Sequence, residues 1–267
     1  MTSFFVVRLI VERTIKLDCN TYFLFNRFDE SSSALRKALD LLPDDNYVQL
    51  NHLAALMQMG RIDMDETVID IFDLSNLSAE ERLKVMKLKG AVNYKKGNFR
   101  AAIEAFGALD WNDLDEASAI DYSLALQESG CDEKALDVLS FAANKIGSSN
   151  LYHYLATAYL HGAYVEEALA VYENFLCHLN EPSDLVRQLL VEYAQLLKYI
   201  DRAGNCNKFR RVCEKAIDFK LFPPPQSKAD CFFTGFAYYI LGRSELAKHY
   251  HEYSADFSAE YYDKIEL

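Results

Sequence analysis

Apolar side chains recur along this chain at the spacing of helical faces. Two consecutive stretches within residues 150–179 place apolar side chains at offsets of 3, 4 and 7, which lie on one face of an α-helix. The residues at these offsets are Tyr152, Leu155 and Tyr159 in the first stretch and Ala168, Tyr172 and Phe175 in the second. Two such faces joined by a short loop predict an antiparallel helical hairpin.

The same pattern of apolar and small residues recurs along the chain. Unit starts lie near residues 12, 46, 83, 116, 149, 190 and 228, at intervals of 34, 37, 33, 33, 41 and 38. The longer intervals predict extended helices or loops near residues 72–81, 177–190 and 221–228, and the run PPPQ at 223–226 marks a break in the last of these. Stacking of neighbouring hairpins would bury the apolar faces that one hairpin cannot bury alone.

The order of residue sizes within each unit resembles the tetratricopeptide repeat (TPR), which has a length of about 34 residues. Ala156 and Ala168 occupy its small positions, where two helices cross. The resemblance covers residues 12–255. It implies an all-α fold, a right-handed α-α superhelix (α-solenoid) of about seven antiparallel helix hairpins. Residues 1–11 are then expected to extend the first helix, and residues 256–267 to form a C-terminal capping helix.

The net charge of the chain disfavours some classes of binding partner. The net charge is −12, and a field of that sign disfavours nucleic-acid backbones and anionic lipid.

No stretch approaches the roughly 20 apolar residues that cross a bilayer, and Arg8 interrupts the apolar start of the chain, unlike a signal peptide. The six cysteines lack CxxC spacing, which favours reduced thiols. We expect a soluble, cytoplasmic protein with no nucleic-acid partner and no membrane insertion.

No catalytic or cofactor-binding motif stands out. The chain contains none of GxxxxGK[ST], GxGxxG, HExxH or GxSxG. His249 and His251 are two residues apart on a predicted helix and point to different faces, and Cys206 and Cys213 are one pair where a zinc site needs more ligands. We therefore expect a protein that is not an enzyme and holds no cofactor or metal. An enzyme whose site has no motif is the remote alternative.

The resemblance implies that the first helix of each unit lines a concave groove. In this frame the N-terminal third of the groove is basic, which favours an acidic peptide or a chain-terminal carboxylate. The expected partner-binding residues there are Lys16, Asn20, Asn51, Lys84, Lys87, Tyr94 and Lys95. Four of them resemble the carboxylate clamp of heat-shock co-chaperones, namely Lys16, Asn20, Asn51 and Lys84. Leu88 stands where that pattern needs Arg, and solvated lysines beside a generic groove are the alternative.

Aromatic residues gather on the last predicted first helix. Phe232, Phe236 and Tyr239 are further expected partner-binding residues, with Phe233 beside them. Two interpretations are open: the cluster forms an apolar pocket for a partner, or the C-terminal helix folds back and covers it.

Charge is also segregated along the sequence. Residues 107–137 carry nine acidic side chains and one Lys. The basic residues of the later segment 207–220 are Lys208, Arg210, Arg211, Lys215 and Lys220. Solvation is the usual role of such clusters, and head-to-tail self-association or docking of a charged partner is the alternative.

Together these features predict a non-catalytic scaffold or adaptor that holds a peptide or helix of a partner protein in its groove, with aromatic anchors and lysines that select charge. A peptide-sensing regulator and a chaperone for a secreted or assembly partner are the alternatives.

Overall fold

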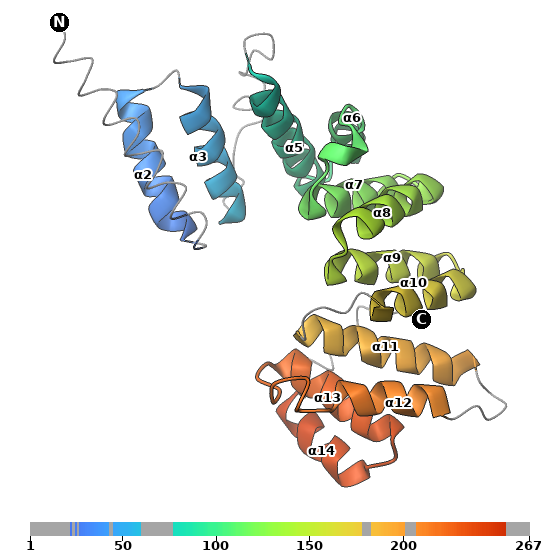
Figure 1. The fold of residues 1–267 in the computed structure, drawn as a ribbon. Coiled ribbons are helices and arrows are strands. Elements are labelled where there is room, and N and C mark those ends of the chain that lie inside the picture. Colours follow the sequence, from blue (N-terminus) through green and yellow to red (C-terminus); the bar gives the residue numbers. More distant parts are fainter. Residues whose placement is uncertain are drawn as a thin grey trace, which may run out of the picture. The chain divides into compact units, whose positions relative to one another are not determined.

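The computed structural model of the chain describes residues 27–42, 45–59, 77–177, 183–200 and 207–254, together with Tyr22 and Phe25. These residues form α-helices, turns and one short 3-10 helix, with no strand among them (Figure 1). The helices are α2 (Phe28–Leu41), α3 (Asn46–Gln58), α5 (Ala79–Lys95), α6 (Phe99–Gly107), α7 (Glu116–Glu128), α8 (Asp132–Ile146), α9 (Ser149–His161), α10 (Val165–Cys177), α11 (Asp184–Ile200), α12 (Asn207–Ala216), α13 (Lys228–Ile240) and α14 (Ser244–Tyr253).

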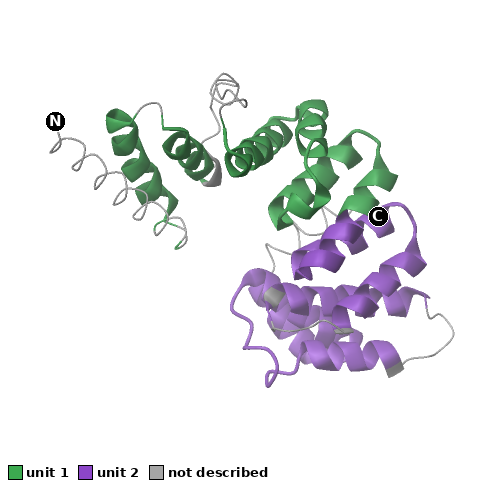
Figure 2. Cartoon of the chain, turned by 45° about the horizontal axis from the view of Figure 1, so that its top comes forward, with its two compact units in different colours: residues 1–138 green, residues 139–267 purple. Residues whose placement is uncertain are grey.

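The chain divides into two compact units, residues 1–138 (unit 1) and 139–267 (unit 2), which Figure 2 shows in two colours. Helices pack as antiparallel pairs within them, α5 with α6 in unit 1 and α9 with α10, α11 with α12 and α13 with α14 in unit 2. We term the leading helices α3, α5, α7, α9, α11 and α13 the first helices. The helices α2, α6, α8, α10, α12 and α14 are the second helices.

A Ser or Asp side chain caps every first helix. Each cap accepts a hydrogen bond from the backbone amide three residues later, which satisfies a donor that the helix itself leaves unpaired. The caps are Asp45, Ser78, Asp115, Ser148, Ser183 and Ser227. At Ser78 the cap is a full capping box, because Glu81 accepts a hydrogen bond from the Ser78 amide in return.

Four first helices end in the same Schellman turn. In each turn, one amide bonds back to the carbonyl five residues earlier, as Tyr164 does to Tyr159 at 2.8 Å. The residues of positive φ in these turns are Gly97, Gly130, Ala163 and Gly242. Because a Cβ is unfavourable in the left-handed region, Ala163 (φ 59°) is the strained member of the set.

Small residues lie where paired helices approach most closely. A Cβ on Gly90 of α5 would lie 2.6 Å from the ring of Phe106 on α6, and that ring is fully buried. Ala156 of α9 and Ala168 of α10 are also fully buried. Larger side chains at these positions would force the helices apart.

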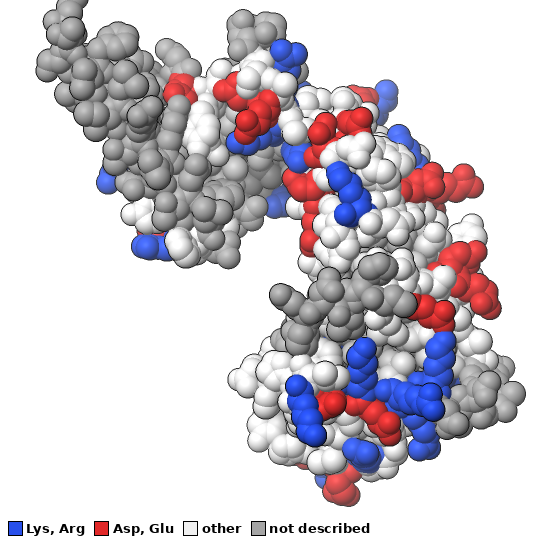
Figure 3. All heavy atoms as spheres, viewed as in Figure 1, with Lys and Arg blue, Asp and Glu red and all other residues white. Residues whose placement is uncertain are grey.

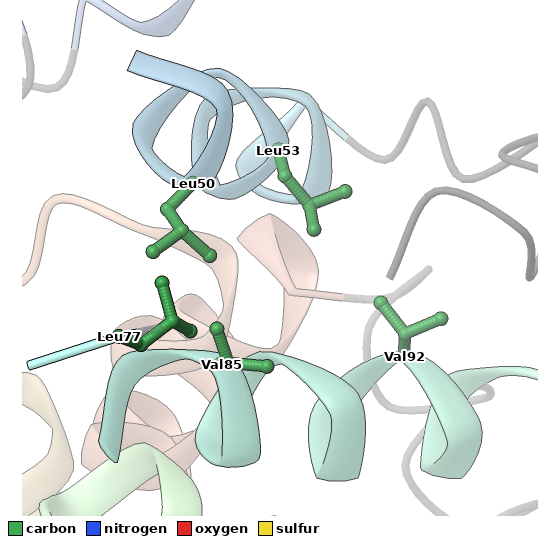
Figure 4. Packing of buried hydrophobic residues seen from close by; sticks show 5 residues of the cluster. All are labelled: Leu50, Leu53, Leu77, Val85 and Val92. Carbon is green, nitrogen blue, oxygen red and sulfur yellow. The ribbon is translucent and has the colours of Figure 1, made fainter. Parts of the chain in front are cut away.

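An apolar cluster joins α3 to α5 in unit 1. Figure 4 shows Leu50 and Leu53 of α3 directed towards Leu77, Val85 and Val92, which lie on α5 or just before it. All five side chains are almost fully buried, and burying a side chain of this size contributes about 1.5–3 kcal/mol. The two first helices therefore belong to one packed layer.

A buried ion pair joins α11 to α13 in the core of unit 2. Arg187 of α11 pairs with Asp230 of α13, and both side chains are almost inaccessible to solvent. The same guanidinium donates to the carbonyl oxygens of Ala216 (3.1 Å) and Pro223 (2.7 Å). Charges removed from water need such partners, so Arg187 fixes the loop between α12 and α13.

The helices confirm the all-α prediction. Four first helices begin at residues 46, 116, 149 and 228, as the repeat frame predicts, whereas α5 and α11 begin earlier, at 79 and 184. Both of these helices are 17 residues long, so extended helices account for part of the longer intervals. The expected N-terminal extension (1–11) and capping helix (256–267) lie outside the described residues.

None of the described helices combines the length and the apolar character that a membrane crossing requires.

Candidate partner-binding surfaces

Successive first helices pack against one another within each unit. In unit 1, α5 contacts both α3 and α7, and in unit 2, α11 contacts both α9 and α13. Each unit therefore has a layer of first helices. The accessible side chains of each layer form what we term the first-helix face of that unit, and the predicted partner-binding residues belong to first helices.

Two predicted lysines on α5 lie close to carboxylates of the same unit. The Lys84 ammonium is 3.5 Å from Glu80 and lies over the ring of Tyr47 on α3, 5.7 Å from its centroid. The Lys87 ammonium is 2.7 Å from Asp115 at the start of α7. An acidic partner would therefore compete with these carboxylates, although exposed ion pairs are worth only about 0–1 kcal/mol.

The third predicted lysine of α5, Lys95, is exposed and acts electrostatically on Asp121 of α7. Burial raises the pKa of Asp121 to about 6, against the opposing effect of Lys95. Burial also raises the pKa of Asp115, but hydrogen bonds from Lys87 and Ser118 outweigh it and hold that pKa below its usual value. The predicted basic strip is thus a mixed surface of lysines and carboxylates.

Asn51 and Tyr94, two further predicted residues of unit 1, contact residues that are close to them in sequence. The Asn51 side-chain amide donates to the carbonyl oxygen of Tyr47, one turn earlier on α3 (2.7 Å). The ring of Tyr94 lies 6.0 Å from that of Phe99. Lys16 and Asn20 lie outside the described residues, so the structure places only half of the predicted clamp, Asn51 and Lys84.

A polar group links α9, α10 and α11 in unit 2. Nδ1 of His153 is 3.3 Å from Oε2 of Glu192, which also accepts a hydrogen bond from the Tyr172 hydroxyl (3.4 Å). Gln188 donates to the other carboxylate oxygen at 2.8 Å. Burial lowers the pKa of His153, but the neighbouring Glu192 carboxylate outweighs this and raises the pKa above its ordinary value.

Phe232 belongs to the core, contrary to the prediction that it binds a partner. Only 1% of its surface is exposed, and its ring contacts Phe233 of the same helix and His251 of α14 (ring centroids 5.2 and 5.9 Å apart). Helix α14 packs along α13 and covers this side chain. Phe233 is buried as well. The C-terminal helix that the alternative interpretation places over the cluster lies outside the described residues, so that interpretation stays a prediction.

Tyr239, in contrast, is accessible. It is 60% exposed, its ring lies 5.9 Å from that of the half-buried Phe236, and the Lys198 ammonium of α11 lies 5.7 Å from its centroid. A cation over an aromatic face is attracted by the ring quadrupole. Helices α11 and α13 thus present an exposed aromatic ring and an exposed cation, with the half-buried ring of Phe236 beside them.

An apolar groove lies between α10 and α12, alongside α11, with a volume of about 860 Å³. Its lining residues are Leu169, Leu176, Leu190, Leu197, Ile200, Lys208, Phe209, Arg211, Val212 and Lys215. Figure 3 shows Lys and Arg side chains gathered over the region of α12. The sequence analysis identified these cations but not the groove.

Neither a family model nor a curated protein matches this sequence. Solved structures do match its fold. A human IFIT1 dimer with PPP-AAAA aligns with a TM-score of 0.54 at 15% identity, over 94% of this chain and 68% of that one. A human IFIT1 dimer with m7Gppp-AAAA aligns with a TM-score of 0.55 at 15% identity, over 94% and 67%. A tetratricopeptide repeat protein from Parabacteroides merdae aligns with a TM-score of 0.50 at 13% identity, over 88% and 83%. The chain has a TPR-like fold. At these identities the likeness concerns the fold alone.

The TPR-like frame did not predict Arg187, because a repeat pattern records the sizes of residues and not a buried charge. The available signal was a lone arginine inside the apolar run LVRQLLV of α11. A cation in such a run is retained where it has a buried partner, which is Asp230, 43 positions later.

Among the described residues of this TPR-like chain, no three His, Cys, Asp or Glu side chains gather in a way that could hold a metal ion. Burial raises the pKa of the Cys213 thiol to about 12, so this side chain stays protonated at neutral pH. Cys213 is fully buried and acts as a small apolar residue on the inner face of α12.

Proposed function

We propose that this chain is a non-catalytic protein-interaction scaffold that binds a peptide or helix of a partner protein on its first-helix face. The observation that carries the proposal is the exposed ring of Tyr239 on α13, with Phe236 beside it and the cation of α11 over it. Tyr239 presents a large ring to solvent beside Phe236 and Lys198. Tyrosine is enriched among the residues that dominate binding energy at protein interfaces, and stacked helical repeats expose extended surfaces of this kind.

The surface chemistry of each unit, taken separately, favours a different feature of a partner. In unit 2 the exposed ring of Tyr239 beside Phe236 suits an apolar anchor. In unit 1 Lys84 and Lys87 suit carboxylates that displace Glu80 and Asp115. Lysine provides a point charge on a flexible stem, so the replacement of one carboxylate by another beside it costs little free energy.

We do not extend nucleic-acid binding to this chain. Human IFIT1 is described with PPP-AAAA and with m7Gppp-AAAA. The present chain has a net charge of −12, which repels a polyanionic backbone. The first-helix face also carries carboxylates, among them Glu192 and Asp121.

Affinity capture with matched variants tests the proposal. Partners bound by the wild-type chain are identified by mass spectrometry and compared with those of Tyr239→Ala. Tyr253→Ala is the control, because Tyr253 is 64% exposed but lies on the second helix α14. A partner of the first-helix face is lost with Tyr239→Ala and retained with Tyr253→Ala. Equal recovery with both variants would refute the proposed site.

A further inference from the structure

We propose that the groove between α10 and α12 is a second docking site, which binds an amphipathic helix of a partner protein whose polar face carries carboxylates. This site lies between second helices and does not depend on the first-helix face proposed above.

The walls of the groove are apolar along two helical turns. The pairs Leu169 and Leu176 on α10, and Leu190 and Leu197 on α11, are each seven residues apart, which spans about 10 Å along a helix. Ile200 at the end of α11 is 41% exposed. Leu190 is already buried at the base of the groove, whereas Leu169, Leu176 and Leu197 are partly exposed. An occupant that removes the exposed surface from water must present its own apolar stripe, and an amphipathic helix does so at offsets of 3, 4 and 7.

The rim of the groove is cationic. Lys208, Arg211 and Lys215 share one face of α12, at offsets of 3 and 7. Lys208 already pairs with Glu173 of α10, which also accepts a hydrogen bond from Tyr193 (3.1 Å). No carboxylate in the described part of unit 2 pairs with Arg211 or Lys215. These two cations can therefore receive carboxylates from a partner.

The local charge contrasts with that of the whole chain. Helix α12 carries four cations and one carboxylate, Glu214, in a chain of net charge −12. Complementary charge at the edge of an apolar site sets orientation and selects partners. An acidic helix with an apolar stripe matches both the walls and the rim.

A partner helix fits better than the other occupants with this chemistry. A second copy of the chain offers acidic side chains on α7 and α8, but the large apolar residues Tyr122, Leu126 and Leu139 of these helices are already buried in their own fold. A lipid surface needs apolar side chains that protrude, whereas these walls enclose a groove, and the net charge opposes anionic lipid.

A synthetic peptide provides the probe. It is an amphipathic helix of roughly 18 residues, long enough for appreciable helicity, with Leu along one stripe and Glu on both sides of it. A second peptide has Gln in place of every Glu. Binding to the full chain is measured by fluorescence anisotropy at about 0.15 M salt, where distant surface charges are largely screened.

Charge-reversal variants test the rim. We expect Arg211→Glu with Lys215→Glu to weaken binding of the Glu peptide about tenfold or more. The matched control is Arg210→Glu with Lys220→Glu, which makes the same change in net charge at exposed residues that do not line the groove. It should alter the affinity less than about twofold.

A neutral variant tests the apolar wall. Ile200→Asn should weaken binding of the Glu peptide several-fold, whereas Ile146→Asn, at an isoleucine of similar exposure on α8, should not. Circular dichroism confirms that each variant is folded. Tyr239→Ala should leave peptide binding unchanged, which separates this proposal from the proposed function.

Several results would overturn the inference. These are no saturable binding of the Glu peptide, equal binding of the Gln peptide, or equal loss in the two charge-reversal variants. Tighter peptide binding after Phe257→Asp and Tyr261→Asp in the full chain would assign the groove to the chain's own C-terminal residues. Self-association that Ile200→Asn abolishes would assign it to a second copy. Binding of anionic vesicles that requires Arg211 and Lys215 would assign it to a membrane.

Discussion

Arg187 has hydrogen-bonding or ion-pair partners on α12, on the α12–α13 loop and on α13. Its replacement by Met would leave Asp230 as a buried carboxylate without its counter-charge. We expect Arg187→Met to lower the free energy of unfolding by about 3–5 kcal/mol, the usual cost of removing one partner of a buried pair. Chemical denaturation monitored by circular dichroism measures this loss. Arg100→Met, at an arginine that is almost fully solvent-exposed, should stay within about 0.5 kcal/mol of wild type.

Ala163 occupies the left-handed position that glycine holds in the three equivalent turns. Ala163→Gly removes a Cβ penalty of about 1–2 kcal/mol, and the added freedom of glycine in the unfolded chain offsets roughly 0.5–1 kcal/mol of this gain. We therefore expect a net increase in unfolding free energy of about 0.5–1 kcal/mol, measured by thermal and chemical denaturation. A lower melting temperature would contradict the turn geometry.

His153 links the stability of unit 2 to pH. Because its pKa is raised in the folded state, protonation favours folding. Its contribution is complete below the unfolded-state pKa of about 6.5 and is lost as the pH rises through the folded-state pKa. Burial lowers the pKa values of His52 and His251 in the folded state. Protonation of these two residues therefore opposes folding.

Comparison of wild type with His153→Gln isolates this effect. The stability difference between the two proteins, measured by denaturation over a pH series, should be largest at low pH and should shrink as the pH rises. A difference that is constant across the series would show that His153 does not titrate with folding.

Paired helices in this chain depend on small residues at their crossings. Ala168 of α10 has no exposed surface, so a larger side chain there has no route to solvent. We expect Ala168→Leu to lower the free energy of unfolding by about 1–3 kcal/mol through overpacking. The control is Ala170→Leu on the exposed side of the same helix, which should be nearly neutral. Equal effects of the two substitutions would show that the crossing is misplaced.

The sequence predicted helices well where each element carries its own signals. Ser148 and the apolar periodicity that follows it are enough to locate α9, and its predicted start agrees with the structure. The start of α11 was predicted six residues too late, since Phe209 occupies an expected small position on α12. A repeat pattern also cannot show the pairing of Arg187 with Asp230, because this contact joins segments that are 43 positions apart.

The candidate site was harder to predict than the helices. Periodicity places Phe232, Phe236 and Tyr239 on one helix but does not show which of them the next helix covers. Phe232 is buried under α14 and Tyr239 is exposed, a difference that arises from packing between helices. The lysines of α5 were likewise identified as cations, while the partners Glu80 and Asp115 emerged only from the fold.

Unit 2 presents two surfaces that are built from different sets of helices. The first-helix face of unit 2 offers Tyr239, Phe236 and Lys198, whereas the groove between α10 and α12 offers apolar walls with Arg211 and Lys215. A scaffold that uses both could hold two partner segments at once, which raises avidity when one protein supplies both segments.

Site-specific photo-crosslinking shows whether a partner protein contacts the first-helix face of unit 2. A photoreactive phenylalanine analogue replaces Tyr239 on the first-helix face in one protein and Tyr253 on α14 in another, and crosslinked products from cells are identified by mass spectrometry. We predict a discrete protein crosslinked from position 239 and absent from position 253. Crosslinking of the same protein from position 253 alone, or of none from position 239, would contradict a partner site on the first-helix face.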